Sequence, residues 1–185
     1  LCVGIFAPYR RFEDAIQAVS ILKKKGYDLR LLIRGTAGGK DSSYAKYLLE
    51  LIRSKDLDQV VQLEFGIISE EALKKLYAEA DIFVFPTYID KPRYGYGWGL
   101  ATFEAMAAGT PVIVCRTTAS TRLLRDKENA ILVSPKSPNE IAAGLISLLD
   151  QPNFYFQIAK SAQDLALHIV TWEAYTYSMR RVFAE

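Results

Sequence analysis

The fold is decided by the segment Gly95-Tyr96-Gly97-Trp98-Gly99-Leu100-Ala101-Thr102-Phe103-Glu104-Ala105-Met106-Ala107-Ala108-Gly109-Thr110-Pro111-Val112-Ile113-Val114. It contains a glycine-rich loop, a helix that begins at the glycines, a Gly-Thr-Pro break and an apolar run typical of a buried strand. Alternate glycines let backbone N–H groups approach a ligand closely, and the start of a helix adds free N–H groups and a positive dipole end. The segment therefore indicates either a phosphate site or an ordinary tight connection between a loop and a helix.

Length and composition favour one compact domain that binds a small molecule. The chain has 185 residues, half of them hydrophobic, which is enough for one sizeable core. Its 23 basic and 21 acidic residues give a net charge of +2, which argues against a nucleic-acid-binding surface. Cys2 and Cys115 lie in separate apolar runs, without the spacing of a disulfide framework or a metal site. Because no targeting sequence or long apolar span is recognisable either, we expect a cytoplasmic protein.

Six short apolar runs alternate with segments of helical periodicity. The alternation predicts an α/β fold, with a doubly wound, Rossmann-like parallel sheet of six strands and helices on both faces. Such a sheet binds ligands at the carboxyl ends of its strands, near the point where the strand order reverses. The loops of interest are therefore residues 7–11, 34–41, 66–69 and 86–99. The predicted strands are Leu1–Phe6, Leu29–Ile33, Val60–Phe65, Asp81–Phe85, Pro111–Cys115 and Ala130–Ser134.

The boundaries of several helices are marked by capping residues. Ser69 is the expected N-cap of a helix that runs to about Glu79. Ser137 and Glu140 have the spacing of a capping box, with a proline at the first helical position of a helix that ends near Leu149. A last helix is expected to begin at Thr171, so that residues 1–170 form the core and residues 171–185 form a closing helix.

Several familiar catalytic and cofactor motifs are missing from the sequence. The loop after the first predicted strand reads Ala7-Pro8-Tyr9-Arg10-Arg11, which is not the Gly-x-Gly-x-x-Gly of a dinucleotide site. The chain also has no Gly-Lys-Ser/Thr phosphate loop and no Gly-x-Ser-x-Gly nucleophile elbow. The single histidine, His168, lies between apolar residues of a late helix, where a structural role is more common than a catalytic one.

Two kinds of anion-binding group are expected at one edge of the sheet. Arg10 and Arg11 follow the first strand, and the glycines follow the fourth. Guanidinium groups that face the N–H donors of a helix suit a diphosphate, because Arg pairs with phosphate oxygens through a planar fork of donors. The carboxylate of Glu104 can accept two hydroxyl hydrogen bonds, which suits a ribose diol. Together these groups point to a nucleoside diphosphate; the alternative for the two arginines is a solvated pair near a helix.

Blocks along nearly the whole chain resemble the nucleotide-sugar-binding, C-terminal domain of group 1 (family 4) retaining glycosyltransferases of the GT-B fold. The most specific block is Glu-Ala-Met-Ala-Ala-Gly-Thr-Pro-Val-Ile, at residues 104–113. The other blocks are Arg10-Arg11-Phe12-Glu13-Asp14-Ala15-Ile16, Phe65-Gly66, Ala80-Asp81-Ile82-Phe83-Val84-Phe85-Pro86-Thr87, Asn129-Ala130-Ile131-Leu132-Val133 and Thr171-Trp172. The resemblance implies one half of a GT-B enzyme, which transfers the sugar of a nucleoside-diphosphate sugar to an acceptor with retention of configuration.

The resemblance also implies roles for individual residues. Glu104 would hold the ribose hydroxyls, and Arg10 and Arg11 would stabilise the leaving diphosphate. The backbone of Gly97, Gly99 and Leu100 would contact phosphate and sugar, and Tyr96 would lie on the donor-sugar side. Gly66 and Ile67 would face the base. The donor would be a UDP or GDP sugar used in polysaccharide or glycoconjugate synthesis. No metal or other cofactor is demanded if arginine supplies the counter-charge.

The sequence departs from the family pattern near the donor sugar. The family commonly has a glutamate eight positions before Glu104, where this chain has Tyr96, and an arginine where this chain has Ile5. The loop also holds aromatic residues that either stack on sugar rings or cover a hydrophobic edge. These residues are Tyr88, Tyr94, Tyr96 and Trp98. Tyr96 leaves open a non-catalytic relative that binds a nucleotide or a partner protein. A third possibility is an isomerising or phosphorolytic enzyme on the same scaffold, which would share much of the phosphate site.

The resemblance covers only the donor half of a GT-B enzyme. The acceptor-binding half, which precedes the donor half in the family, is not in this sequence. We therefore expect residues 1–185 alone to bind the donor and to transfer no sugar. Contact with a membrane surface is expected only through the full-length protein.

Overall fold

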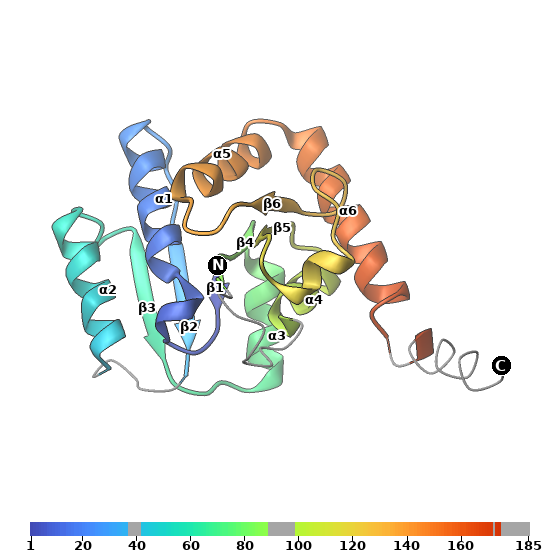
Figure 1. Cartoon of the computed structure of the whole chain (residues 1–185), viewed down its shortest axis with the longest axis horizontal. Coiled ribbons are helices and arrows are strands. Elements are labelled where there is room, and N and C mark those ends of the chain that lie inside the picture. Colours follow the sequence, from blue (N-terminus) through green and yellow to red (C-terminus); the bar gives the residue numbers. More distant parts are fainter. Residues whose placement is uncertain (37–41, 89–98, 172, 175–185) are drawn as a thin grey trace.

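The computed structural model describes residues 1–36, 42–88, 99–171 and 173–174. Strands and helices alternate through these residues, and all six predicted strands are present, most of them shortened at their ends (Figure 1). In chain order the elements are β1 (Cys2–Val3), the 3₁₀ turn η1 (Pro8–Arg10), α1 (Phe12–Lys24), β2 (Leu31–Gly35), α2 (Ser43–Ser54), β3 (Val61–Phe65), α3 (Glu70–Glu79), β4 (Phe83–Phe85), α4 (Leu100–Ala107), β5 (Val112–Cys115), the 3₁₀ turn η3 (Ala119–Arg122), β6 (Ile131–Val133), α5 (Pro138–Leu149) and α6 (Pro152–His168).

The strands form two parallel, three-stranded sheets, in the orders β1-β2-β3 and β4-β5-β6. This corrects the prediction of a single six-stranded sheet. The two sheets meet at Leu1, whose backbone N donates to Ile82 O at 2.9 Å and whose carbonyl accepts from Val84 N at 2.8 Å. Because β1 has only two residues and β4 only three, this single residue joins the sheets instead of a ladder of paired strands. The point where the strand order reverses therefore lies between β1 and β4.

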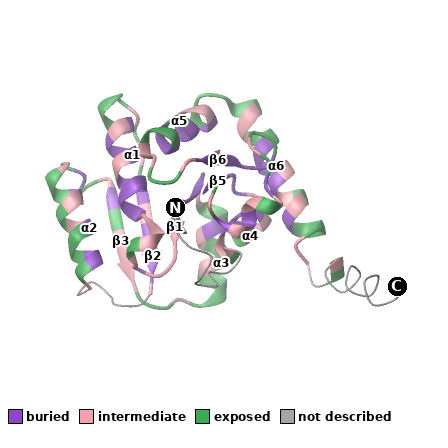
Figure 2. Cartoon of the chain, viewed as in Figure 1, coloured by how far each residue is buried: buried purple, intermediate pink, exposed green. Residues whose placement is uncertain are grey.

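Helices cover both faces of the strands, as the sequence predicts. Alternate strand residues point to opposite faces, and each set enters a different hydrophobic cluster. Figure 2 shows that buried residues are concentrated on the central strands and on parts of the surrounding helices. One cluster joins Ile33, Ile113 and their neighbours to helices α1, α2 and α5. The other joins Phe83, Val112 and their neighbours to α3, α4 and α6. The buried strands thus form a middle layer, and their carboxyl ends carry the loops that lead to η1 and α4.

The helix boundaries follow local capping, with one exception. Ser69 is the N-cap of α3, and its side chain accepts from Ala72 N at 3.2 Å, as predicted. The predicted capping box at Ser137 is not formed, because Ser137 makes no side-chain cap and Glu140 Oε2 instead accepts from Ser134 N at 2.7 Å. This hydrogen bond holds the pKa of Glu140 below its ordinary value of 4.5 and ties the end of β6 to α5.

Replacing Glu140 with glutamine is expected to flatten the acid dependence of stability. A folded-state pKa below the unfolded value adds stability above about pH 4.5 that is lost as the pH falls through the folded pKa. Glu140→Gln should therefore cost less than about 1 kcal/mol at pH 7, because the side chain is exposed, and almost nothing at pH 3. Urea unfolding at both pH values measures this, with Glu50→Gln on an exposed position of α2 as the control. An equal loss at both pH values would contradict the assignment.

The predicted closing helix lies mostly outside the described residues. Thr171 Oγ1 accepts a hydrogen bond from Ala174 N at 3.1 Å, which is the geometry of an N-cap. The expected start of that helix at Thr171 is consistent with this contact.

Candidate functional site

A pocket of about 310 Å³ opens at the carboxyl ends of β1 and β4. It brings together four residues that the sequence singled out, namely Arg10 from the end of η1 and Gly99, Leu100 and Glu104 from the start of α4. These residues lie about 90 positions apart in the chain, and the parallel arrangement of the strands places them at one edge. The pocket has the location that a doubly wound fold predicts for a ligand.

Arg10 is held in the pocket without a carboxylate partner among the described residues. Its guanidinium carbon lies 5.3 Å from the ring centres of both Tyr9 and Phe85, and Nη1 donates to Thr87 Oγ1 at 3.3 Å. Nε is buried and has no hydrogen-bond partner in the described part of the chain. A guanidinium carries five N–H donors, so most of this cation's donors remain for an anion.

Gly4, at the end of β1, makes room for this arginine. A Cβ atom built on Gly4 would lie only 3.1 Å from Arg10 Nε and 3.3 Å from Cζ. Even an alanine would therefore require the guanidinium to shift by a few tenths of an ångström from its position near both rings. The close approach of strand backbone to a charged side chain explains the glycine at this position.

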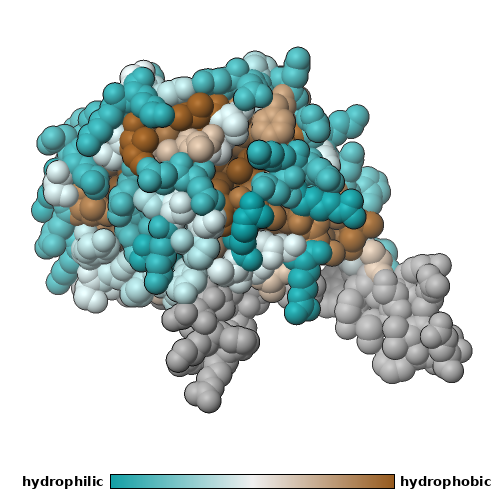
Figure 3. Space-filling model, turned by 45° about the horizontal axis from the view of Figure 1, so that its top comes forward, coloured by the Kyte–Doolittle hydropathy of each residue, from teal (hydrophilic) through white to brown (hydrophobic). Residues whose placement is uncertain are grey.

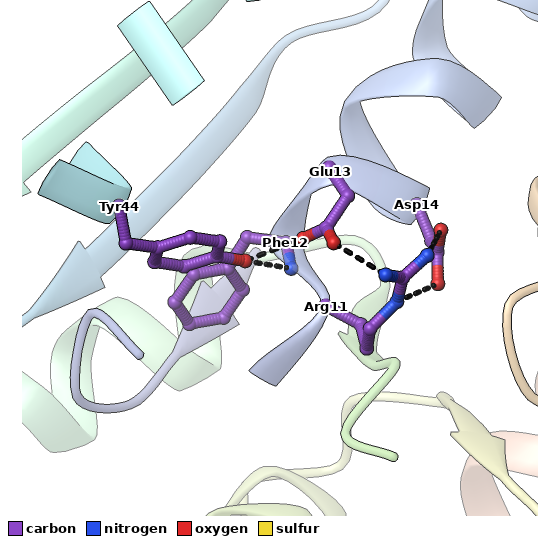
Figure 4. Close-up of polar contacts among 5 residues, drawn as sticks. All are labelled: Arg11, Phe12, Glu13, Asp14 and Tyr44. Carbon is purple, nitrogen blue, oxygen red and sulfur yellow. Dashed lines mark hydrogen bonds and ion pairs between the residues drawn. The ribbon is translucent and has the colours of Figure 1, made fainter. Parts of the chain in front are cut away.

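Arg11 belongs to a different network, which Figure 4 shows. Its side chain pairs with Asp14 through Nε and Nη2, at 2.9 and 2.7 Å, and with Glu13 through Nη1, at 2.7 Å. The hydroxyl of Tyr44 donates to Glu13 Oε2 and accepts from Phe12 N. The partial burial of Arg11 lowers the pKa of its guanidinium. The hydrogen bond to Asp14 and the negative charges of Glu13 and Asp14, both buried, outweigh this effect and raise the pKa above its ordinary value. The structure does not bring Arg11 into the pocket of Arg10.

We expect the replacement of Arg11 with glutamine to lower stability and to leave ligand affinity unchanged. The change removes the cation from two buried carboxylates and should cost about 1–3 kcal/mol of the free energy of unfolding. Denaturant unfolding measures this loss, and calorimetry below the unfolding transition measures affinity for a nucleoside diphosphate. Loss of affinity at unchanged stability would contradict the assignment of Arg11 to this network.

The start of α4 supplies backbone donors to the pocket. Gly99 has φ 70° and ψ 54°, a left-handed conformation that favours glycine, and a Cβ there would meet the Phe85 ring at 3.0 Å. The first intrahelical bond runs from Thr102 N to Gly99 O at 2.8 Å, so the N–H groups of Leu100 and Ala101 precede it. Gly99, Leu100 and Ala101 all line the pocket, with the positive end of the helix dipole.

Glu104 lies on the second turn of α4 and is exposed to the pocket. Its Oε2 accepts a hydrogen bond from the hydroxyl of Tyr77 at 2.8 Å. No basic residue pairs with Glu104 among the residues that the structure describes. The carboxylate therefore keeps most of its acceptor positions for hydroxyl groups.

The structure does not place every predicted site residue in this pocket. Gly66 has φ 110° and donates its N–H to Gly35 O at 3.0 Å, and Ile67 is 89% exposed. Both follow β3, at the far edge of the first sheet, and neither lines the pocket. Tyr96 and Gly97 lie outside the described residues. Their predicted roles remain predictions.

Several pocket residues were not anticipated from the sequence. Thr87 and Tyr77 make the hydrogen bonds to Arg10 and Glu104, and Tyr9 and Phe85 flank the guanidinium. Thr87 could have been noted because it follows β4 directly. Tyr77 carries no local signal, since an aromatic residue near the end of a helix most often belongs to the core.

A second cavity, of about 340 Å³, lies at the opposite edge, where the strands begin. Its lining is mostly hydrophobic and includes Leu1, Leu31, Ile82 and Leu145. Figure 3, which brings this side of the molecule forward, shows hydrophobic residues exposed between hydrophilic ones. The cavity contains none of the predicted site residues, and we assign the candidate site to the smaller pocket, where charged and backbone donor groups converge.

The described residues hold no cluster of three or more potential metal ligands from His, Cys, Asp and Glu. None of the described helices is long and apolar enough to cross a membrane. Burial raises the pKa of Cys2 to about 11. That thiol, on β1, is therefore protonated at neutral pH.

Comparison with solved structures places the chain among known folds. The chain is similar to the C-terminal domain of a group 1 family glycosyl transferase (LpcC) from Francisella tularensis, with 26% identity and a TM-score of 0.79 over 92% of this chain and 86% of that one. It also resembles Anabaena HepE, solved in complex with UDP, with a TM-score of 0.78 at 18% identity, over 99% of this chain and 48% of that one. At that identity the second likeness supports the fold alone.

The relatives found by sequence similarity are also glycosyltransferases. An uncharacterized glycosyltransferase from Methanocaldococcus jannaschii is 28% identical over 94% of this chain and 41% of the relative. A D-inositol 3-phosphate glycosyltransferase from Corynebacterium aurimucosum is 28% identical over 99% of this chain and 42% of the relative. The chain thus spans about two fifths of the length of these relatives. The family model described as "Glycosyl transferases group 1" matches residues 1–165, and the chain belongs to this family.

Proposed function

We propose that this chain is the donor-binding domain of a retaining glycosyltransferase and that its pocket binds the nucleoside diphosphate of a sugar donor. One observation carries the proposal. An arginine without a carboxylate partner and a glutamate without a cation partner, in the described part of the chain, open on the same pocket as the start of α4. The two opposite charges line one pocket and do not pair with each other there, which leaves each available to a different part of a ligand.

Each group suits one part of a nucleoside diphosphate. Arg10 binds the diphosphate, because its free donors and its charge match phosphate oxygens. The N–H groups at Leu100 and Ala101 bind the distal phosphate at the positive end of α4. The carboxylate of Glu104 accepts hydrogen bonds from the ribose 2′- and 3′-hydroxyls. Arg11 contributes stability instead of phosphate charge, because Glu13 and Asp14 already neutralise it.

The proposed chemistry is a displacement at the anomeric carbon of the donor sugar. The bond between that carbon and the diphosphate oxygen breaks, and a bond to the acceptor oxygen forms, while the acceptor's proton leaves with the diphosphate. Negative charge builds on the departing diphosphate, and Arg10 and the α4 N–H groups stabilise it. With this counter-charge supplied by the protein, we expect transfer to need no metal ion.

The base and sugar sites extend beyond the described pocket. We propose that Gly66 and Ile67 face the base, because they follow the carboxyl end of β3, at the same end of the first sheet as the pocket. Gly97 and Tyr96 are proposed to lie beside the donor sugar. HepE, whose fold this chain shares, has been solved with UDP and with UDP-glucose, and this makes uridine the first base to test.

The proposal for the whole protein includes an acceptor-binding domain, since the chain spans 41% of the Methanocaldococcus relative. Residues 1–185 alone would then bind the donor and transfer no sugar. Nuclear magnetic resonance of the product formed by the full-length enzyme reports whether the anomeric configuration is retained.

The direct test is calorimetric titration of the chain with UDP, GDP and ADP. At least one diphosphate should bind, and the corresponding monophosphate should bind more weakly because it offers less charge to Arg10 and α4. Absence of binding by all three diphosphates would reject the proposed site.

The second candidate is a relative that binds a nucleotide and has lost sugar transfer. The residue that favours it is Tyr96, which stands where the family commonly has a glutamate. In the full-length protein, an inactive wild type that gains activity from Tyr96→Glu would favour this candidate. An active wild type would exclude it.

A further inference from the structure

We infer that Tyr77 is a positioning residue that fixes the carboxylate of Glu104 for recognition of a vicinal diol. The inference rests on the proposed function, because it concerns how the same pocket distinguishes a ribose from a deoxyribose. Tyr77 lies in the last turn of α3, on a different element from Glu104, and both residues line the pocket.

Tyr77 is held in place by the packing of its ring and by a hydrogen bond to its backbone. Its side chain is 2% exposed, and the ring packs edge-on against Phe83 with 5.6 Å between ring centres. Its backbone carbonyl accepts a hydrogen bond from Thr110 Oγ1 at 2.6 Å, which ties the end of α3 to the break after α4. The hydroxyl is therefore fixed relative to the start of β5, and it does not move with the side chain of Glu104.

This fixed hydroxyl donates to Glu104 Oε2 at 2.8 Å. An exposed glutamate otherwise samples several rotamers and loses that freedom on binding, which lowers affinity. With one oxygen anchored, the other oxygen and the remaining lone pair of Oε2 face the pocket in one arrangement. Two acceptor positions at a fixed separation match two adjacent hydroxyl donors, which is the pattern of a vicinal diol.

The hydroxyl of Tyr77 also remains a donor at neutral pH. Burial, followed by the nearby charge of Glu104 and the hydrogen bond to it, raises the pKa of Tyr77 above its ordinary value of 10. A neutral phenol beside a carboxylate can only donate to it. The hydrogen bond between the two residues therefore keeps its direction, with the Tyr77 hydroxyl as donor and Glu104 Oε2 as acceptor.

The test compares Tyr77→Phe with wild type, using the ribonucleoside diphosphate that binds among UDP, GDP and ADP, and its 2′-deoxy analogue. Wild type should prefer the ribose form by at least about tenfold, since one lost hydrogen bond to a charged group costs roughly 1.5–3 kcal/mol. Tyr77→Phe should cut this preference to about twofold and leave affinity for the 2′-deoxy form nearly unchanged.

Controls separate positioning from packing. Tyr155→Phe removes a hydroxyl that donates to Asp81 O, outside the pocket, and should leave the preference intact. In a Glu104→Gln background, Tyr77→Phe should have no further effect on the preference, because its partner carboxylate is already gone. If all diphosphates fail to bind wild type, the proposed function itself fails. If wild type prefers ribose and Tyr77→Phe prefers it equally, the proposed function stands and the role of Tyr77 is refuted.

Discussion

A protein with Arg10 replaced by glutamine is expected to bind its nucleoside diphosphate about 100-fold more weakly than wild type. The guanidinium has no carboxylate partner in the described residues, and among them only Thr87 accepts a hydrogen bond from it, so its charge and most of its Nη donors are available to phosphate. Hydrogen bonds between charged groups contribute about 1.5–3 kcal/mol, and Arg10 can make more than one with a diphosphate. Calorimetric titration of both proteins measures the difference.

Two arginine variants make this result specific. Arg53→Gln, at an exposed position of α2, tests the effect of net charge alone and should change affinity less than twofold. Arg11→Gln should destabilise the protein and keep its affinity. If Arg11→Gln loses the ligand while Arg10→Gln binds as wild type does, the diphosphate site has been assigned to the wrong arginine.

Replacing Glu104 with glutamine is expected to weaken binding about 30-fold. The amide has one acceptor oxygen in place of two and no negative charge, so it can satisfy only part of a ribose diol. The lost hydrogen bonds to a charged group correspond to roughly 1.5–3 kcal/mol. Affinity for the 2′-deoxy nucleotide should fall less than affinity for the ribonucleotide, which calorimetry with both ligands measures.

Glu79→Gln is the matched control for this prediction. Glu79 ends α3 and lies at the cavity on the opposite edge, where it pairs with Lys75 at 3.6 Å. Its replacement should leave both affinities unchanged. An equal loss of affinity for ribo and deoxy forms in Glu104→Gln would show that Glu104 supports the pocket without contacting the ribose.

The order of elements could be predicted from the sequence because each strand and helix carries its own pattern. Apolar runs such as Pro111–Cys115 and the cap at Ser69 are local signals, and the structure reproduces them. The joint between the sheets is not local. It depends on Leu1 meeting Ile82 and Val84, residues about 80 positions away, and no spacing in the sequence reports that contact. The same applies to Glu140, which meets the requirements of a capping box but binds Ser134.

The candidate site was predictable in its location and in part of its chemistry. Arg10, Gly99 and Glu104 follow from their places after strands and at the start of a helix. Adjacent arginines look alike in a sequence, however, and only the fold shows that buried carboxylates on α1 neutralise Arg11 while aromatic rings flank Arg10. Tyr77 was missed for the same reason, since its partner lies 27 positions away on another helix.

The most direct test of the proposed site is a ¹⁵N-resolved nuclear magnetic resonance titration of the chain with UDP, GDP and ADP. The diphosphate that binds should shift the amide resonances of Gly99, Leu100 and Ala101 and the Nε–H resonance of Arg10. Resonances of Leu31, Ile82 and Leu145, at the opposite edge, should stay in place. Shifts confined to that opposite edge, or no shifts with any of the three, would contradict a nucleoside-diphosphate site at the start of α4.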